Sequence, residues 1–303
     1  MTKAENNEKI INLPFVKNAM SIAPSFVTPL RYPGGKARLG HWLSELLKFN
    51  KLENSTYIEP YAGGAGAAVY LLTNKLVKSI AINDIDPAVY SFWWALLNET
   101  DALKEKILHT EVSIETWEIQ KRIISNQDNP CRVELGFAAF FLNRTNRSGI
   151  INGGVIGGKS QTGKYKIDAR YNKIGLLSRI DKIASLREHI HLTNLDALEL
   201  LHNWRDRKDT IVYLDPPYYQ KGGQLYRNHY QPEDHAMIAE KVCSLQAPWL
   251  VTYDNCSEIR EIYKNSNHVE FSFHYSTHLQ RPIGQEVMFY NNIHLHSTPK
   301  MRR

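Results

Sequence analysis

The sequence predicts an α/β protein whose mostly parallel sheet ends in an antiparallel hairpin and is interrupted by a helical insertion. Two observations lead to this prediction. Strand-like and helix-like apolar segments alternate from residue 56 onward, and the alternation returns after residue 190. Between about residues 99 and 189 strand patterns are absent and helical spacing prevails. We therefore expect residues 30–98 and 190–296 to form one interrupted domain, and residues 99–189 to form a second, helical domain.

The individual elements follow from local patterns. Short apolar runs bounded by turn-forming residues predict strands at residues 56–59, 79–82, 191–193, 211–214, 249–253, 269–275 and 285–290. Helices are expected at residues 67–74 and 88–97, after the first and second strands. Within the insertion, Leu176, Ile180, Ile183 and Arg187 recur at helical spacing. A turn containing Pro and Gly separates the last two strands, which indicates a hairpin.

The composition is that of an ordinary globular chain. Its 303 residues are 43% hydrophobic and 22% charged, which excludes collagen-like, disordered and coiled-coil classes. The three cysteines form no metal-binding or disulfide pattern, and the histidines do not cluster at metal-ligand spacing. We therefore expect no metal site and a reducing, cytoplasmic environment. No apolar run reaches the roughly 18 residues that span a membrane, so no membrane association is expected.

The positive charge is concentrated in the insertion. The whole chain has a formal net charge of +6. Residues 131–187 contain 11 Lys and Arg against 3 Asp and Glu, a net charge of +8, which leaves −2 for the remainder. A basic, glycine-containing insertion on a nearly neutral body favours a polyanionic partner such as double-stranded DNA, because Lys and Arg neutralise phosphates.

Polar residues follow four of the expected strands at the point where each strand ends. The glycine-rich segment 59–64 follows the first strand, Asp84 the second and Asp196 the third, and the sequence Asp-Pro-Pro-Tyr at residues 215–218 follows the fourth. An acidic residue at such a place is often only a turn former or a helix N-cap. Ligands of open α/β sheets bind outside the carboxyl ends of the strands, so four such ends together indicate a ligand site.

Asp215-Pro216-Pro217-Tyr218 suits methyl transfer to an exocyclic amino nitrogen. The lone pair of such a nitrogen is delocalised into the base, so acceptors must draw on its hydrogens before it attacks a methyl group. The Asp215 carboxylate and the Pro216 carbonyl provide two acceptors, and the two prolines hold them rigidly. The Tyr218 ring offers a face on which a base can stack.

These residues resemble a known family, the Dam-type DNA adenine-N6 methyltransferases. The resemblance extends over about residues 30–292 and depends on three motifs, at residues 31–36, 58–64 and 215–218. It implies a Rossmann-like methyltransferase sheet, S-adenosylmethionine as methyl donor, and catalysis by Asp215, Pro216, Pro217 and Tyr218. In such enzymes Tyr32, Gly34 and Lys36 would hold the amino-acid end of the donor, Asp84 its ribose and Asp196 its adenine. The full set of donor-binding residues implied is Tyr32, Gly34, Lys36, Glu59, Tyr61, Gly63, Asp84 and Asp196.

The same resemblance makes residues 99–189 the target-recognition domain. Residues 141–149 are similar to the start of the Dam recognition loop, which implies DNA contacts from Arg147, Ser148 and Asn152. Lys159, farther along the basic segment, is also expected to contact DNA, and Arg144 is either a DNA contact or a structural residue. Dam proteins that recognise GATC have an arginine where this chain has Asn152, so GATC is not expected as the target. The target adenine has to be flipped out of the duplex, and residues 219–226, with their glycines, are expected to form a mobile loop over the site.

Parts of the sequence also suggest other functions. Residues 153–160 match the phosphate-binding pattern of P-loop nucleoside triphosphatases, but no strand is expected before them and no helix after them. Cys131 follows Pro130, as the nucleophile does in cytosine methylation, but it is placed at the start of a helix instead of after a strand. RNA or a protein amide as substrate, and a non-catalytic DNA-binding component of a defence system, remain open. A cognate restriction or defence protein is a candidate partner, and the oligomeric state is not predicted.

Overall fold

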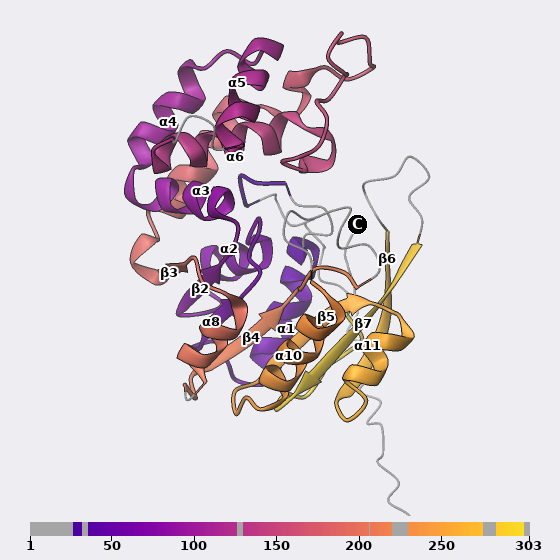
Figure 1. Ribbon diagram of the computed structural model, residues 1–303. Helices are drawn as coiled ribbons and strands as arrows, with labels where there is room; N and C mark the ends of the chain where they lie inside the picture. Colours follow the sequence, from indigo (N-terminus) through magenta and orange to yellow (C-terminus); the bar gives the residue numbers. More distant parts are fainter. Residues whose placement is uncertain are drawn as a thin grey trace, which may run out of the picture.

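The structure is a computed structural model that describes residues 27–31, 36–125, 130–205, 207–219, 230–274 and 283–299. A seven-stranded sheet forms the lower part of the molecule in Figure 1, and a group of helices lies above it. The expected α/β class, with a mostly parallel sheet and helices inserted between its strands, is confirmed. The expected lead-in over residues 1–26 lies outside the described residues. Within the described ranges, no helix is both long and apolar enough to cross a lipid bilayer.

The sheet has the strand order β3-β2-β1-β4-β5-β7-β6. Its strands are β1 (Thr56–Glu59), β2 (Ser79–Asn83), β3 (Ile190–Thr193), β4 (Thr210–Leu214), β5 (Trp249–Asp254), β6 (Asn267–His274) and β7 (Ile283–Asn291). The first five are parallel, whereas β7 is antiparallel to both β5 and β6. The expected hairpin is therefore present, but its second strand lies inside the sheet and its first strand forms the edge.

The described helices are η1 (Lys36–Leu39), α1 (Gly40–Phe49), α2 (Gly66–Thr73), α3 (Pro87–Asn98), α4 (Thr100–His109), α5 (Ile114–Ile124), α6 (Arg132–Thr145), η2 (Arg147–Gly149), η3 (Ile167–Arg170), α7 (Lys173–Ala184), η4 (Arg187–His189), α8 (Ala197–Trp204), α10 (Pro232–Cys243) and α11 (Ser257–Ile262). The helices expected at residues 67–74 and 88–97, and the one indicated by Leu176, Ile180 and Ile183, are present as α2, α3 and α7. The stripe of α7 ends at Ile183, and Arg187 belongs to the next short helix.

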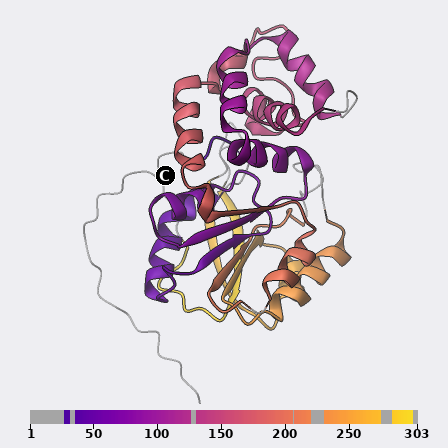
Figure 2. The ribbon, with the colours of Figure 1, turned by 90° about the vertical axis from the view of Figure 1, so that its left-hand side faces the viewer.

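Helices cover both faces of the sheet, as parallel strands require. Side chains alternate along each strand, so Tyr57 and Tyr213 belong to the core cluster on one face, while Ile58 and Val212 belong to the cluster on the other. The first cluster includes apolar residues of α1, α2 and α3, and the second those of α8, α10 and α11. Figure 2 shows α1 in indigo on one side of the sheet and α10 in orange on the other.

The helical part is joined to the sheet-bearing part through α3, which packs against α6. A Cβ atom added to Gly136 of α6 would lie 2.4 Å from the carbonyl oxygen of Ser91 in α3, so only glycine permits this approach. Phe92 and Phe140 stack across the same contact with ring centroids 5.7 Å apart. The apolar core therefore continues from the sheet into the insertion, and the division between residues 98 and 99 stays a prediction.

The P-loop interpretation is excluded by the local structure. Residues 153–160 come after the short helix η2 and consist mainly of turns, with an isolated bridge from Val155 to Asn146. A phosphate-binding loop would have to follow a strand and begin a helix. Cys131 is the N-cap residue of α6, as expected, and does not follow a strand.

Candidate active site

The site lies where the strand order of the sheet reverses. From β1 the chain proceeds outward through β2 to β3, then returns to β4 beside β1 and proceeds to β5 on the other side. The segments after β1 and β4 therefore lead to helices on opposite faces of the sheet, and the ligand-binding crevice of open α/β sheets lies at the carboxyl edge between two such segments. Asp215 directly follows β4 at this point.

Alternation along the strands directs three polar side chains to one face of the sheet. Asp215 is two residues after Tyr213, and Thr252 is two residues after Leu250, so each points to the same face as that residue. Tyr213 and Leu250 both belong to the core cluster that includes α1. Because β7 is antiparallel to β5, its residue Glu286 pairs with Asp254 and also reaches the carboxyl edge. Glu286 is two residues before Met288, which belongs to the same core cluster, so Glu286 points to the same face of the sheet.

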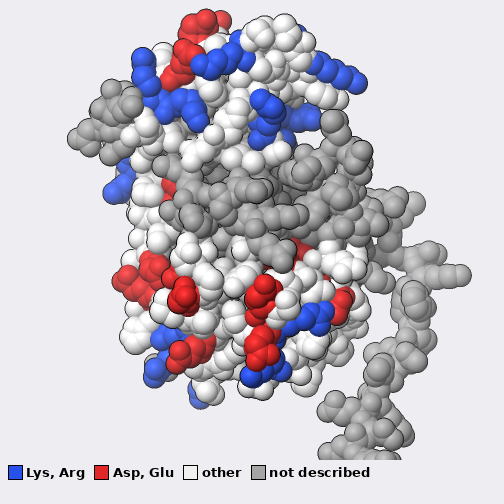
Figure 3. Space-filling view, turned by 45° about the vertical axis from the view of Figure 1, so that its right-hand side comes forward, with Lys and Arg blue, Asp and Glu red and all other residues white. Residues whose placement is uncertain are grey.

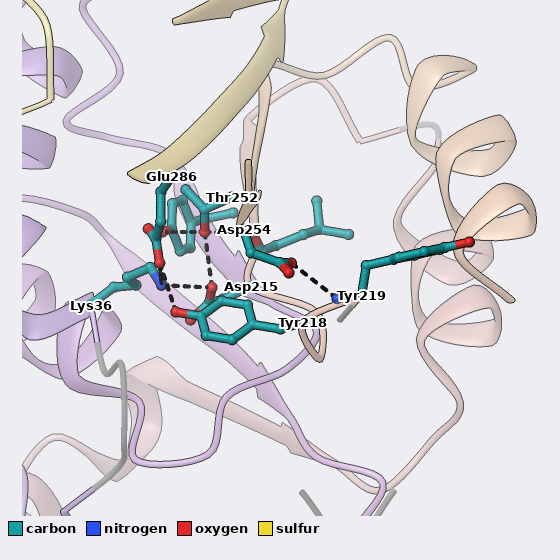
Figure 4. Close-up of polar contacts among 9 residues, drawn as sticks. Lys36, Asp215, Tyr218, Tyr219, Thr252, Asp254 and Glu286 are labelled. Atoms are coloured by element: carbon teal, nitrogen blue, oxygen red, sulfur yellow. Dashed lines mark hydrogen bonds and ion pairs between the residues drawn. The ribbon is translucent and has the colours of Figure 1, made fainter. Parts of the chain in front are cut away.

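Lys36 joins two carboxylates in this cluster (Figure 4). Its Nζ atom lies 2.9 Å from Oδ1 of Asp215 and 3.2 Å from Oε1 of Glu286. The Thr252 hydroxyl donates to the same Asp215 oxygen at 2.9 Å. Among the described residues no hydrogen bond reaches the other oxygen, Oδ2, and the Asp215 side chain keeps 23% of its surface accessible. The carboxylate is thus held by one oxygen and can use the other for a ligand.

The charges in this cluster explain the direction of the pKa shifts. Burial alone would lower the pKa of Lys36, but the carboxylates of Asp215 and Glu286 outweigh it and hold this pKa well above its ordinary value. Burial raises the pKa of Glu286, and Asp215 adds to the shift while Lys36 opposes it. The lysine is therefore charged at neutral pH.

The residues after Asp215 are anchored on both sides. The Tyr218 hydroxyl donates to Oε1 of Glu286 at 2.7 Å, and the ring is only 3% exposed. The backbone N–H of Tyr219 donates to Oδ1 of Asp254 at 3.0 Å (Figure 4). With the ring covered in this way, a stacking face for a base is not displayed, and the stacking role stays a prediction. Residues 220–226 of the expected mobile loop lie outside the described residues.

Asp84 lies at the end of β2, on the other side of the crevice. Its Oδ2 accepts from the N–H of Gly63 at 2.8 Å, and its Oδ1 accepts from the N–H of Asp86 at 2.9 Å. Burial raises the pKa of this carboxyl to about 7, although the two N–H groups oppose the shift. Gly63 has a φ of 47°, a conformation that favours glycine, and it connects the glycine-rich loop to Asp84.

The remaining expected donor-binding residues occupy different environments. Glu59 is buried, and its Oε1 accepts from the N–H of Ala68 in the first turn of α2 at 3.1 Å. Burial raises the pKa of Glu59 to about 8. Asp196 is exposed and caps α8 through the N–H of Leu198. The Tyr61 hydroxyl lies 2.7 Å from that of Tyr230. Tyr32 and Gly34 lie outside the described residues.

Arg144 has a structural environment. It is 8% exposed, and its guanidinium donates to the carbonyl oxygens of Arg170 and Pro29. Burial, together with neighbouring arginines, lowers its pKa to about 9. Its neighbour Asn143 donates to the carbonyls of Arg31 and Gly149 and accepts from the N–H of Arg31, so it joins the N-terminal motif to the insertion. The sequence had not indicated Asn143 as a site residue.

The other residues expected to contact DNA lie at the surface of the insertion. Arg147, Asn152 and Lys159 are exposed and Ser148 is half-buried. Ser148 has a φ of 58° in the turn that reverses the chain after α6. Lys159 is paired with Glu118 at 3.0 Å and lies over the Trp117 ring. On the face drawn in Figure 3, Lys and Arg are more frequent on the upper, helical part and Asp and Glu on the part below.

Three functional candidates were missed by the sequence reasoning: Thr252, Asp254 and Glu286. Glu286 had one local signal, because it is a charged residue directly before the apolar run Val287-Met288-Phe289 of an expected strand. Its proximity to Asp215 depends on the antiparallel pairing of β5 with β7, which local patterns do not specify.

The strand order, which reverses beside β1 and β4, and the helices on both faces define a doubly wound α/β sheet. Residues 32–280 match the model of the D12 class N6 adenine-specific DNA methyltransferases. The chain belongs to this family, and it is an adenine-specific DNA methyltransferase. The resemblance to Dam-type enzymes is thereby confirmed.

A curated relative and two solved structures complete the comparison. The Type II methyltransferase M.MjaIII of Methanocaldococcus jannaschii is 24% identical over 204 residues, which are 62% of this chain and 68% of the relative. The protein PH1948 of Pyrococcus horikoshii is 11% identical with a TM-score of 0.40, covering 92% of this chain and 91% of its own. Protein LPL1258 of Legionella pneumophila is 11% identical with a TM-score of 0.32, covering 90% and 87%. These two structural similarities are too distant to bear on function.

Proposed function

We propose that this protein transfers a methyl group from S-adenosylmethionine to N6 of an adenine flipped out of double-stranded DNA at a specific sequence. The observation that supports it most directly is the Asp215 carboxylate at the reversal point of the sheet, held through Oδ1 by Lys36 and Thr252. The description of M.MjaIII as a Type II methyltransferase supports recognition of a defined site and a role beside a restriction enzyme.

The residues at the end of β2 fit the donor. Each oxygen of Asp84 accepts one backbone N–H, and a carboxylate oxygen has a second lone pair for a ribose hydroxyl. Asp196 uses Oδ1 to cap α8, and its exposed carboxylate can accept from an adenine amino group. The bound donor would supply an activated methyl group on a positively charged sulfur. The other proposed donor-binding residues are Tyr32, Gly34, Lys36, Glu59, Tyr61 and Gly63.

The target amino group would meet two acceptors from one rigid segment. Asp215 Oδ2 would accept a hydrogen bond from one amino hydrogen, and the Pro216 carbonyl would accept one from the other. These hydrogen bonds increase the electron density on the nitrogen as it attacks the methyl carbon. Pro216 and Pro217 fix the backbone between the acceptors, because their rings lock φ. The Tyr218 ring would stack on the flipped base once a face of it is exposed.

DNA would be held by the basic insertion, residues 99–189, acting as the recognition domain. Arg147, Ser148, Asn152 and Lys159 are the proposed contacts, because they lie at its surface. Arg144 is left out of this set, because its hydrogen bonds go to two backbone carbonyls inside the protein. Lys159 would have to exchange Glu118 for a phosphate, and an exposed ion pair of this kind costs little to break.

The test is a transfer assay with S-adenosylmethionine labelled in its methyl group. The protein is incubated with mixed-sequence duplex DNA, single-stranded RNA or a protein extract, and modified nucleosides are identified after digestion. We expect label in N6-methyladenine from DNA, and its loss in Asp215→Ala. Label in cytosine, in RNA or in protein only, or label that persists in Asp215→Ala, would contradict the proposal.

A further inference from the structure

Glu286 is a buried carboxylate that stability alone does not explain. It is 0% exposed, and its Oε2 has no hydrogen-bond partner among the described residues. Burying an ionised carboxylate is costly, and replacing a buried ion pair by apolar residues is often neutral or stabilising. The three residues that follow it in β7, Val287, Met288 and Phe289, are all apolar and buried. A glutamate at this point of β7 therefore indicates a role in the site.

The position of Glu286 connects three segments that are distant in the sequence. Its Oε1 accepts from the Tyr218 hydroxyl at 2.7 Å and from Lys36 at 3.2 Å. These partners come from the segment after β4 and from η1, whereas Glu286 belongs to β7. A hydrogen bond to the phenol hydroxyl limits how the Tyr218 ring can tilt, and supporting hydrogen bonds of this kind hold reacting groups in place.

Glu286 and Asp215 both pair with the positively charged ammonium group of Lys36. The ammonium lies 2.9 Å from Asp215 and 3.2 Å from Glu286, so neither carboxylate has it alone. If Glu286 were neutral, Asp215 would be the one charged carboxylate of this pair, and Lys36 would withdraw more negative charge from it. Asp215 would then be a weaker acceptor for the hydrogens of an amino group.

We propose that Glu286 is a positioning residue for methyl transfer, which holds the Tyr218 ring through its hydroxyl and limits the pairing of Lys36 with Asp215. This inference depends on the proposed function, in which Asp215 accepts from the target amino group. Glu286 touches neither the donor nor the base. It acts through the residues that do.

The main test compares methyl transfer in a single turnover, at saturating donor and DNA, by Glu286→Gln, Tyr218→Phe and the double variant. Gln keeps the shape of Glu and loses its charge. We expect Glu286→Gln to lower the transfer rate at least about 10-fold while the Kd values for DNA and donor stay within about 3-fold. We expect the double variant to be no slower than Glu286→Gln, because the two residues act through one contact. The matched control is Glu270→Gln in β6, an exposed glutamate paired with Arg260, which should transfer at the wild-type rate.

A rate within about 2-fold of wild type for Glu286→Gln, or rate losses that multiply in the double variant, would overturn the proposal. A second measurement separates it from the proposed function. With ¹³Cζ-labelled tyrosine, the signal assigned to Tyr218 should shift in Glu286→Gln and stay in place in Glu270→Gln. If the wild-type protein methylated no DNA, the proposed function would fail. An unmoved Tyr218 signal would overturn the positioning contact whether or not the protein were active.

Discussion

Replacing Lys36 with Met would leave two carboxylates facing each other in a buried place. Removing one partner of a buried ion pair costs about 3–5 kcal/mol. The lower end applies here, since the Asp215 side chain keeps 23% of its surface accessible. We therefore expect Lys36→Met to lower the free energy of unfolding by about 3 kcal/mol near pH 8, a Tm decrease of roughly 6–10 °C.

The pH dependence of this loss has a definite sign. Burial raises the pKa of Glu286, and without Lys36 the opposing effect of the ammonium is gone. A carboxyl with a raised folded-state pKa destabilises the protein as pH rises and releases this penalty as pH falls. The difference between wild type and Lys36→Met should therefore shrink between pH 8 and pH 5.5.

The assay is urea unfolding followed by circular dichroism at both pH values. Lys36→Met/Glu286→Gln should recover more than half of the loss, since it removes the like-charge repulsion. Lys104→Met is the matched control: Lys104 pairs with Asp181 at 2.7 Å at the surface, so its replacement should change stability little. A loss below about 1 kcal/mol for Lys36→Met, or no recovery in the double variant, would refute the charge arrangement described for the site.

Three further predictions concern other parts of the molecule. Burial raises the pKa of Asp84 to about 7, so its carboxylate becomes ionised between pH 6 and pH 8. Affinity for the demethylated donor, measured by isothermal titration, should therefore rise about tenfold over this range, and Asp84→Asn should remove the rise. The same rise in affinity with pH in wild type and Asp84→Asn would contradict the ribose contact. Burial raises the pKa of Glu59 from 4.5 to about 8, so this carboxyl destabilises the fold increasingly as pH rises through that range. In urea unfolding, Glu59→Gln should be more stable than wild type by about 3 kcal/mol at pH 7 and equally stable near pH 4.5. A variant less stable than wild type at pH 7 would show that the carboxylate is ionised in the fold. Gly136→Ala should destabilise the protein by about 1–3 kcal/mol despite the higher helix propensity of Ala, because the new Cβ would lie 2.4 Å from a backbone oxygen of α3. The control is Gly175→Ala in α7, where the nearest atom to the new Cβ is 3.4 Å away, and this change should not destabilise the protein.

The sheet could be predicted because its strands are short apolar runs that end in turn residues. Both faces are covered by helices, so the central strands β1, β2 and β4 are buried along their whole length, and the polar residues that follow β2, β3 and β4 stand out. Asp84, Asp196 and Asp215 were found in this way. The helix α1 was not anticipated, although Leu43, Leu46 and Leu47 have helical spacing.

Pairing between distant strands set the limit of prediction. The hairpin of β6 and β7 is a local pattern, but local patterns do not specify which of its strands pairs with β5. In the structure the second strand, β7, pairs with β5, and the first strand, β6, forms the edge of the sheet. That pairing brings Glu286 to Lys36 and Tyr218. The sequence also left two roles open for Arg144, a DNA contact or a structural residue, because its burial and its hydrogen bonds to two backbone carbonyls depend on the tertiary structure.

The most direct test of the account is a map of methylated adenines in DNA from a host that lacks adenine methylation and expresses this protein. We predict N6-methyladenine at nearly every copy of one short sequence, and none in cells that express Asp215→Ala at the same level. An unmethylated genome, or the same methylation pattern with Asp215→Ala, would contradict the claim that this chain methylates adenine through the carboxylate at the end of β4.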